Sequence, residues 1–263
     1  MMTKEELKKR VCDAIANRKE DIKALAADIW REPELGYKEV KTAAKVETAF
    51  TALNVPFKNQ LALTGVKARL KGGKGSKHSI CVIGELDAII CADHPDADTI
   101  SGAAHCCGHN AQIANMMAVT MGLVDSGAME YLAGDVVPFA VPAEEYVEIT
   151  YRNKLIKDGK IKYIGGKPEL ISRGEFDDID MALQIHLTGV KQDRPNDFIE
   201  ISTTTNGFIG KLINYKGKPA HAAAAPHLGV NALNAAMMGL MGVNAIRDTF
   251  REKDYVRFHP IIT

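Results

Sequence analysis

The chain has 263 residues, 46% of them hydrophobic and 25% charged, and its 33 basic residues balance its 33 acidic ones. This composition predicts a globular protein with one large domain or two modest ones. The zero net charge gives no indication of a nucleic-acid partner, and no apolar run is long enough to span a bilayer. The charged N-terminus lacks the apolar segment of a signal peptide, so we expect a cytoplasmic protein whose five cysteines are reduced.

The first third of the chain predicts helices followed by a strand. Thr3 and Glu6 have the spacing of a capping box at the start of a helix. Apolar periodicity continues from there in one long helix, or in two helices with a break near Asn17. The elements predicted in this region are the helical segment up to residue 30, a helix over 38–53 and a strand over 65–70.

Three short apolar runs follow, at residues 79–87, 135–141 and 179–186. Each is too short for a typical helix, and continuous apolar runs between helical segments are typical of buried parallel strands. Helices predicted over about 108–125 and 153–173 would connect them. Strands that alternate with helices predict an α/β fold with a mostly parallel sheet. We assign this larger domain to residues 1–198.

From residue 199 the pattern changes to that of a smaller α+β unit, which we assign to residues 199–263. Residues 199–216 predict one or two strands, residues 229–250 an apolar helix rich in alanine and methionine, and residues 255–262 a further strand. The chain has no repeat of fixed period and no low-complexity tract.

Polar residues able to bind a metal follow each of the three apolar runs. Glu85 and Asp87 end the first run, Glu144 and Glu145 follow the second, and His186 ends the third. Parallel strands place their carboxyl ends at one edge of a sheet, where ligands bind. We therefore expect these residues to meet in one crevice.

The stretch AAHCCGHN at residues 103–110 lies near the same edge, where a loop enters a helix. Cys107 and His109 are two residues apart, so an extended turn could aim both at one ion. Thiolate, imidazole and carboxylate are ligands of zinc, and the mixed set also admits manganese or cobalt. A bound metal makes water nucleophilic, and one of two adjacent carboxylates can bind it while the other acts as the base.

Each of these features has a simpler explanation when taken alone. The HCCGH motif is as consistent with a structural thiol cluster, most Glu-Glu pairs are solvated, and a histidine that ends an apolar strand is more often a core residue. Their joint placement at strand ends favours a metal site. A zinc deaminase is disfavoured because no Pro-Cys-x-x-Cys follows a His-x-Glu, and a redox Cys-x-x-Cys motif is absent.

Seven motifs occur in order along the chain: REPELG (31–36), GELDAI (84–89), HCCGHN (105–110), PAEE (142–145), DDIDMALQIHL (177–187), GKPAHAAAAPHLGVNAL (217–233) and RFHPIIT (257–263). Together they resemble the zinc-dependent aminoacylase and hippurate-hydrolase family of amidohydrolases, which includes p-aminobenzoyl-glutamate hydrolases. The resemblance implies a metallopeptidase-like catalytic domain with a smaller lid or dimerisation domain inserted. It also implies cleavage of an amide bond in N-acyl or N-aroyl amino acids or small peptides.

The resemblance also implies roles for individual residues. Divalent metal, zinc or manganese as one or two ions, is bound by Cys107, His109, Glu145 and His186. Glu144 is the general base that activates water and later protonates the leaving amine, and Asp87 orients a ligand or the water from behind the ligands. His221, in the smaller unit, binds the substrate or the tetrahedral oxyanion, although alone it is nearly as consistent with a surface turn. The implied partners are a small N-acyl amino acid or dipeptide-like substrate and a second copy of the chain.

The sequence departs from the family at several points. Asn110 stands where most members have Asp, and PAEE continues into Tyr146 and Val147 in place of a glycine-rich stretch. Members also continue beyond residue 263, complete the lid and supply a last metal-binding histidine, which His259 does not replace. We therefore expect a hydrolase completed by a further C-terminal segment or a second polypeptide. The alternative is a non-catalytic remnant that acts only in metal binding or association.

Overall fold

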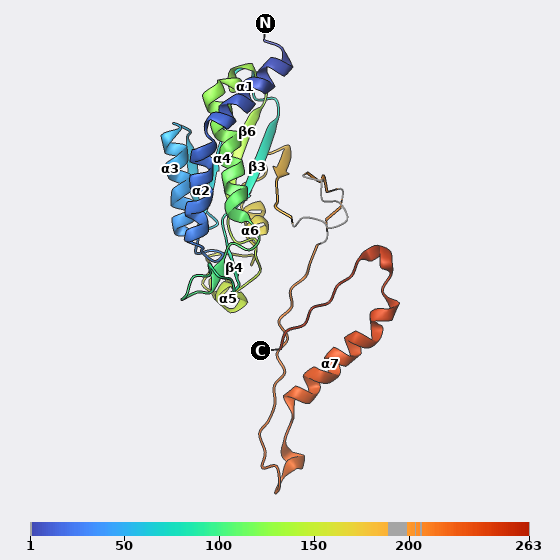
Figure 1. Cartoon of the computed structure of the whole chain (residues 1–263). Coiled ribbons are helices and arrows are strands. Elements are labelled where there is room, and N and C mark those ends of the chain that lie inside the picture. Colours follow the sequence, from blue (N-terminus) through green and yellow to red (C-terminus); the bar gives the residue numbers. More distant parts are fainter. Residues whose placement is uncertain (1, 189–198, 203, 206, 263) are drawn as a thin grey trace. The chain divides into compact units, whose positions relative to one another are not determined.

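The computed structural model describes every residue except 1, 189–198, 203, 206 and 263. The chain divides into two compact units, Met1–Gly189 and Val190–Thr263, which we describe separately (Figure 1). The domain boundary predicted after residue 198 borders residues outside those described and stays a prediction. Within the described residues, no helix has the length and apolar character needed to cross a membrane.

Three helices open the first unit, as the sequence predicts. α1 covers Lys4–Asn17 and begins with the expected capping box, because the Thr3 hydroxyl accepts from the Glu6 N–H and the Glu6 carboxylate accepts from the Thr3 N–H. The helix breaks at Arg18, and α2 continues over Lys19–Arg31. α3 follows over Val40–Ala52.

A five-stranded sheet in the order β1-β2-β6-β3-β7 forms the centre of the first unit. Its strands are β1 (Phe57–Leu61), β2 (Gly65–Ala68), β3 (Ser79–Glu85), β6 (Asp135–Val141) and β7 (Met181–Gln184). β3 pairs in parallel with β6 and with β7, whereas β2 pairs antiparallel with β1 and β6. The three apolar runs are therefore the three parallel strands, as predicted. β1, with the sequence FKNQL, has too few apolar residues for the pattern to predict it.

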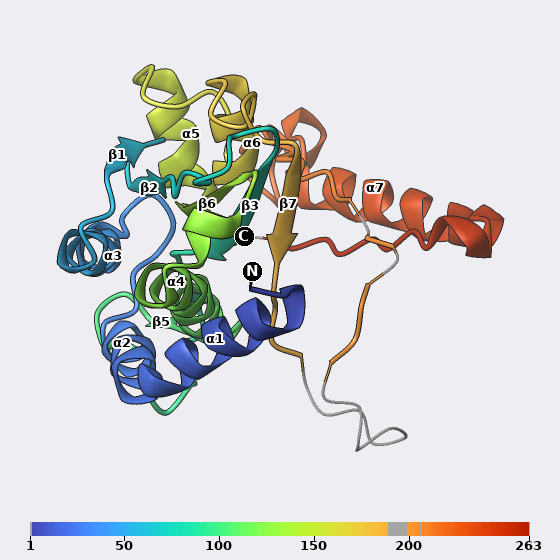
Figure 2. The ribbon, with the colours of Figure 1, turned by 90° about the horizontal axis from the view of Figure 1, so that it is seen from above.

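Helices cover both faces of the sheet (Figure 2). α1, α2, α3 and α4 (His109–Ser126) lie on one face, where Phe50 and Ile113 belong to a core that also contains Val66 of β2. α5 (Ile149–Lys157) and α6 (Gly166–Ser172) lie on the other face, where Leu170 packs in a second core with Phe139 of β6. This three-layer arrangement confirms the predicted α/β class.

Smaller elements connect these layers. β4 (Ile89–Ile90) and β5 (Ala103–Ala104) form a short antiparallel ribbon just before the HCCGH motif. A 3₁₀ turn, η1 (Ala128–Tyr131), follows α4. The ribbon therefore joins the end of β3 to the start of α4, two places where the sequence predicts candidate ligands.

Two details of the first unit differ from the predictions. The helix predicted over 153–173 is two helices, because Gly159 adopts a left-handed φ of +70° that ends α5 before α6 begins. The third apolar run predicts a buried strand, but β7 lies at the edge of the sheet. Among the described residues it pairs only with β3, so Met181 and Leu183 are exposed.

The second unit contains one α-helix among its described residues, α7 (Ala232–Ile246), which confirms the predicted apolar helix. Its 3₁₀ turns are η2 (Pro226–Leu228), η3 (Arg247–Thr249) and η4 (Glu252–Asp254). The strands predicted over 199–216 and 255–262 are wrong: their described residues form no strand, and the nearest pairing is an isolated bridge between Lys218 and Val230. An extended segment becomes a strand only when a neighbour pairs with its backbone.

Candidate metal centre

Three of the four predicted metal ligands converge at the carboxyl ends of β3 and β7. Cys107 precedes α4 and His109 is its first residue, while Gly108 between them has a left-handed φ of +84°. His186 follows β7, and its Nε2 atom lies 3.3 Å from the Sγ atom of Cys107. One ligand atom from each of these three residues lies within 4.8 Å of the other two. A single ion can therefore reach all three.

Hydrogen bonds fix the orientation of both imidazoles. The Nδ1 atom of His109 lies 2.8 Å from the backbone oxygen of Asp87, and that of His186 lies 2.6 Å from the backbone oxygen of Leu187. Because a carbonyl only accepts, both Nδ1 atoms carry a proton, so in the neutral ring it is the Nε2 atom that has the lone pair for a metal. The Nε2 atom of His109 is buried and lies 2.9 Å from the Oε2 atom of Glu85.

The fourth predicted ligand, Glu145, follows β6 and contacts Cys107, but it belongs to neither group of clustered ligand atoms. Its carboxylate accepts a hydrogen bond from the Cys107 thiol, and burial together with this contact raises the pKa of Cys107 to about 12. The neighbouring Glu144 lies with Glu85 and His109 in a second group, whose ligand atoms are also within 4.8 Å of one another. Of the two PAEE carboxylates, Glu144 thus belongs to a group that shares His109 with the first group, whereas Glu145 contacts Cys107 of the first group.

Two buried carboxylates accept hydrogen bonds from the backbone of the PAEE segment. The N–H of Ala143 donates to Glu39 Oε1 at 2.8 Å, and the N–H of Glu145 donates to Asp87 Oδ2 at 2.9 Å. Ala143 has a left-handed φ of +52°, which costs a residue with a Cβ atom about 1 kcal/mol or more. Glu144 lies between these two anchors, so its backbone is held on both sides.

The site is strongly acidic, which favours a cation. Burial alone would lower the pKa of His109, but its contacts with Asp87 and Glu85 raise it to about 10. Burial also raises the pKa of Glu144, and the charge of Glu85 adds to this effect. Glu85 itself stays ionised, because His109 and Lys167 outweigh its burial and hold the pKa of this carboxyl far below its usual range. A divalent ion would therefore replace protons at this site.

Other residues of the HCCGHN motif lie apart from the ligand atoms. Asn110, the departure from the family, donates from Nδ2 to the backbone oxygen of Ala26 at 3.2 Å, so its side chain contacts α2. His105 is buried without a hydrogen bond to either ring nitrogen in the described chain, and burial lowers its pKa to about 4. Cys106 is exposed. None of the three offers an atom to either group of candidate ligands.

His221 lies in the second unit, where its Nδ1 atom accepts from the backbone N–H groups of Ala223 and Ala224 at 3.3 and 3.0 Å. These are the contacts of a local turn, the simpler explanation that the sequence also allows. Because the two units are described separately, a role of His221 at the metal centre stays a prediction.

Two residues to which the sequence assigns no role, Lys167 and Glu39, support the centre, whereas Glu85, which the sequence marks as able to bind a metal at its strand end, belongs to the second group. Lys167 forms an ion pair with Glu85 Oε1 from 82 residues away. Glu39, which also accepts from the Thr64 hydroxyl at 2.7 Å, lies outside the REPELG motif. No local pattern points to Lys167 or Glu39, because their contacts depend on the tertiary fold.

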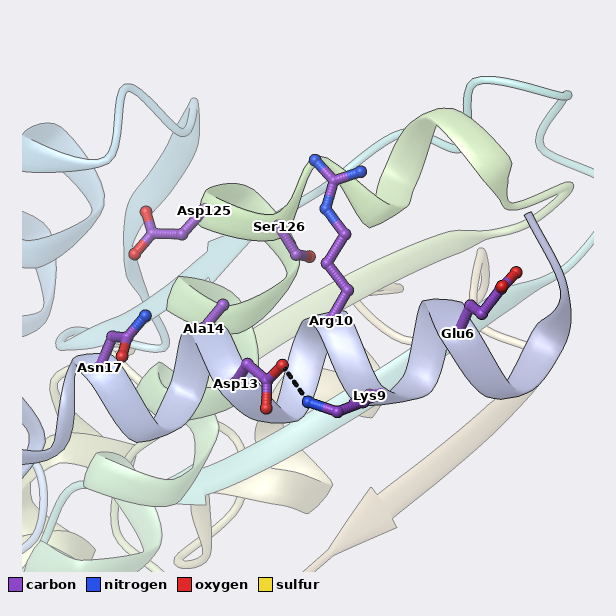
Figure 3. Close-up of a pocket in the computed structure, with 8 residues that line it drawn as sticks. All are labelled: Glu6, Lys9, Arg10, Asp13, Ala14, Asn17, Asp125 and Ser126. Carbon is purple, nitrogen blue, oxygen red and sulfur yellow. Dashed lines mark hydrogen bonds and ion pairs between the residues drawn. The ribbon is translucent and has the colours of Figure 1, made fainter. Parts of the chain in front are cut away.

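A separate hollow lies between α1 and the end of α4 (Figure 3). Its lining residues are Glu6, Lys9, Arg10, Asp13, Ala14, Asn17, Asp125 and Ser126. They carry mixed charge, with Lys9 and Asp13 paired to each other at 2.7 Å, and include none of the predicted site residues. This hollow gives no support to a second active site.

Comparison with known proteins relates the chain to hydrolases. No protein-family model matches it. The Xaa-Arg dipeptidase of Mus musculus is 28% identical over 262 residues, which cover 97% of this chain and 53% of that protein. One of the p-aminobenzoyl-glutamate hydrolase subunits of Escherichia coli (strain K12) is 28% identical over 271 residues, covering 98% of this chain and 50% of that protein. The chain thus spans about half the length of these curated relatives.

Solved structures share the fold. A protein described as an aminohydrolase from methicillin-resistant Staphylococcus aureus aligns with a TM-score of 0.61 and 19% identity, over 90% of this chain and 57% of its own. A dinuclear metal-binding peptidase of the M20 family from Bacillus subtilis aligns with a TM-score of 0.50 and 22% identity, over 65% of this chain and 42% of its own. At these identities the likeness establishes the fold alone.

The class of the first unit is an α/β domain with the fold of these solved structures and with ligand-type side chains clustered at one sheet edge. The sequence relatives narrow this further. The chain is related to the amidohydrolases and peptidases that include p-aminobenzoyl-glutamate hydrolase, which confirms the resemblance that its motifs indicated.

Proposed function

We propose that this chain provides the metal-binding catalytic site of an amidohydrolase that cleaves the amide bond of N-acyl or N-aroyl amino acids or dipeptides. The observation that carries the proposal is the convergence of Cys107, His109 and His186 within 4.8 Å, beside the Glu144–Glu145 pair. These residues come from three separate segments of the chain. Chance clustering of so many ligand types at one sheet edge is rare, and this edge is where α/β folds bind ligands.

The donor set fits a divalent metal. A thiolate, two imidazoles and a carboxylate suit zinc, and manganese is the second choice. Buried His109 supports the assignment, because its Nε2 atom lies 2.9 Å from Glu85 Oε2 and 3.9 Å from Glu144 Oε2, two carboxylates whose charge a bound cation would balance. We propose Cys107, His109, Glu145 and His186 as the ligands. When bound, such an ion polarises the amide carbonyl and makes water acidic enough to act as a nucleophile near neutral pH.

Glu144 is the proposed general base. Its carboxylate takes a proton from the attacking water as the oxygen of that water bonds to the amide carbon. It then delivers the proton to the amine nitrogen as the carbon–nitrogen bond breaks. Burial and the charge of Glu85 raise the pKa of Glu144, which strengthens it as a base. Asp87 positions the neighbouring Glu145 by accepting from its N–H group.

The substrate class rests on the relatives. Their names, Xaa-Arg dipeptidase and p-aminobenzoyl-glutamate hydrolase, both denote an amide bond to the nitrogen of an amino acid. We extend this substrate class to the present chain, with His221 as the proposed contact to the substrate carbonyl or the oxyanion. Association with a second copy, or with a segment that completes the fold, is part of the same proposal.

The metal site is tested with cobalt(II), whose bond to a thiolate gives a charge-transfer absorption band. The 263-residue chain should show this band, Cys107→Ser should abolish it, and the matched neighbour Cys106→Ser should retain it. Binding should also release protons into an unbuffered solution, because metal replaces protons on the Cys107 thiol and His109. An unchanged band in the Cys107 variant would remove that residue from the ligand set.

The reaction is tested by release of amine from p-aminobenzoyl-glutamate, N-benzoyl amino acids and dipeptides. The chain is assayed alone and after co-expression with the C-terminal half of the E. coli relative. In the active arrangement, Glu144→Gln should keep the metal and lose about 10²–10⁴-fold in kcat. Glu145→Gln should lose the metal, whereas the control Glu148→Gln, which pairs with exposed Lys38, should change little. Metal binding without hydrolysis in either arrangement would favour a non-catalytic protein.

A further inference from the structure

The ammonium group of Lys167 points into the metal centre. Lys167 is the second residue of α6, and its Nζ atom forms an ion pair with Glu85 Oε1 at the end of β3. The Lys167 side chain keeps 29% of its surface exposed, while Glu85 keeps 1%. A buried carboxylate needs a compensating charge, and Lys167 supplies it from the accessible side.

Glu85 is at the same time part of the second group of candidate ligands. Its Oε2 atom lies 2.9 Å from His109 Nε2 and accepts from Gln112 Nε2 at 2.8 Å. Glu144 Oε2 lies 3.9 Å from the same nitrogen of His109. The carboxylates of Glu85 and Glu144 thus provide a position for a second cation beside His109, whose single Nε2 lone pair serves the ion held with Cys107 and His186.

We propose that the ammonium of Lys167 fills this second-cation position, so that the chain binds one divalent ion, at Cys107, His109, Glu145 and His186. This inference rests on the proposed function. Unlike a metal ion, an ammonium cannot accept a lone pair from a carboxylate or a water. It can still balance the negative charge of Glu85. It also stabilises the ionised form of the nearby Glu144, the proposed base.

The ammonium and a second ion exclude one another for two reasons. Both would neutralise the same Glu85 carboxylate, whose Oε1 atom is paired with the ammonium and whose Oε2 atom faces His109. The two positive charges would also repel. Repulsion between charges a few ångströms apart is strong in a partly buried site, where the effective dielectric constant is well below that of water. Removing the ammonium should therefore open the position to metal.

The test is the number of cobalt(II) ions bound per chain, measured by titration and by elemental analysis of the desalted 263-residue protein. The wild type should bind one equivalent, which gives the thiolate band. Lys167→Met should bind a second equivalent, which adds cobalt absorption but no further thiolate band. Lys167→Gln, which can still donate to Glu85, gives the same expectation if the Met variant is unstable. Lys167→Arg and the surface control Lys154→Met should stay at one.

The double variant Lys167→Met with Glu85→Gln should return to one equivalent, because the position has then lost the Glu85 carboxylate and keeps only that of Glu144. Two equivalents in the wild type, or one in both uncharged Lys167 variants, would overturn this inference and leave the proposed function standing. No bound cobalt in the wild type would instead overturn the proposed metal centre itself. The number of cobalt ions bound per chain therefore distinguishes an error in this inference from an error in the proposed metal centre.

Discussion

The two units of this chain differ in how far their apolar residues are buried. In the first unit, apolar residues of α4 and β6 are buried in two cores, one on each face of the sheet. In the second unit, none of the described residues is buried, although α7 is the more apolar helix. The exposed apolar residues of α7 are Leu233, Met237, Met238, Met241 and Ile246.

This contrast separates local from non-local structure. α7 forms because its determinants lie within itself: the side chain of Asn231 accepts from the N–H of Asn234 at its first turn, and alanine, leucine and methionine favour the helix. The strands predicted on either side of α7 have the right alternation but no described partner. In the first unit, the alternating sequence of β2 does form a strand, because β1 and β6 pair with its backbone.

The strongest test of the contrast is to separate the units. Residues 1–188 expressed alone should unfold cooperatively in urea, with the same midpoint as the whole chain, because both cores lie within them. Residues 199–262 alone should lose helix gradually, without a cooperative transition. Fluorescence of Trp30, the single tryptophan, follows the first fragment, and far-UV circular dichroism follows the second. A sigmoidal transition in the second fragment would contradict the contrast.

The next largest effect concerns single apolar side chains. Phe139 of β6 is fully buried and packs against Phe176 with ring centroids 5.1 Å apart. Phe139→Ala should therefore lower the free energy of unfolding of the first unit by about 3–5 kcal/mol. Met241→Ala removes a side chain that is 69% exposed, so it should change that free energy by less than about 0.5 kcal/mol. Urea unfolding followed by Trp30 fluorescence measures both; equal effects would show that α7 supports the first unit.

A third effect, specific to the buried polar groups of the first unit, depends on pH. Burial and the nearby charge of Asp87 raise the pKa of Glu39 from 4.5 to about 7. The folded protein therefore holds this proton between about pH 4.5 and 7, where the unfolded chain has released it. Stability from this group is fully present below pH 4.5 and falls as pH rises to 7, by roughly 3 kcal/mol in total.

Glu39→Gln should remove this fall. Glutamine can still accept from the Ala143 N–H and contact the Thr64 hydroxyl, so the variant keeps the contacts without the charge. Metal-free protein should show a free energy of unfolding that declines between pH 5 and 8 in the wild type more steeply than in the variant. The variant should gain relative to the wild type as pH rises. Parallel pH profiles would indicate that Glu39 has an ordinary pKa.

These contrasts also mark how far the sequence could predict the molecule. The order of parallel strands and helices could be predicted from the apolar pattern. The position of Asp87, Glu144 and Glu145 at one edge of the sheet could be predicted too, because they follow β3 and β6, and parallel strands end at the same edge. The exposure of β7 could not be predicted, since an edge strand and a central strand can have the same apolar run. Neither could Lys167 or Glu39, whose partners are 82 and 104 residues away.

The smallest effect compares the two helix caps. Thr3 caps α1, whose Ile15 packs against Gly122 of α4, so Thr3→Ala should lower the free energy of unfolding of the first unit by about 1 kcal/mol, and Thr3→Ser by much less. Asn231 caps α7 in the same way, but α7 has no buried residue. Asn231→Ala should therefore leave the unfolding of the first unit unchanged and instead reduce the helical signal of residues 199–262. An effect of Asn231→Ala on the Trp30 transition would show that the helix is coupled to the core after all.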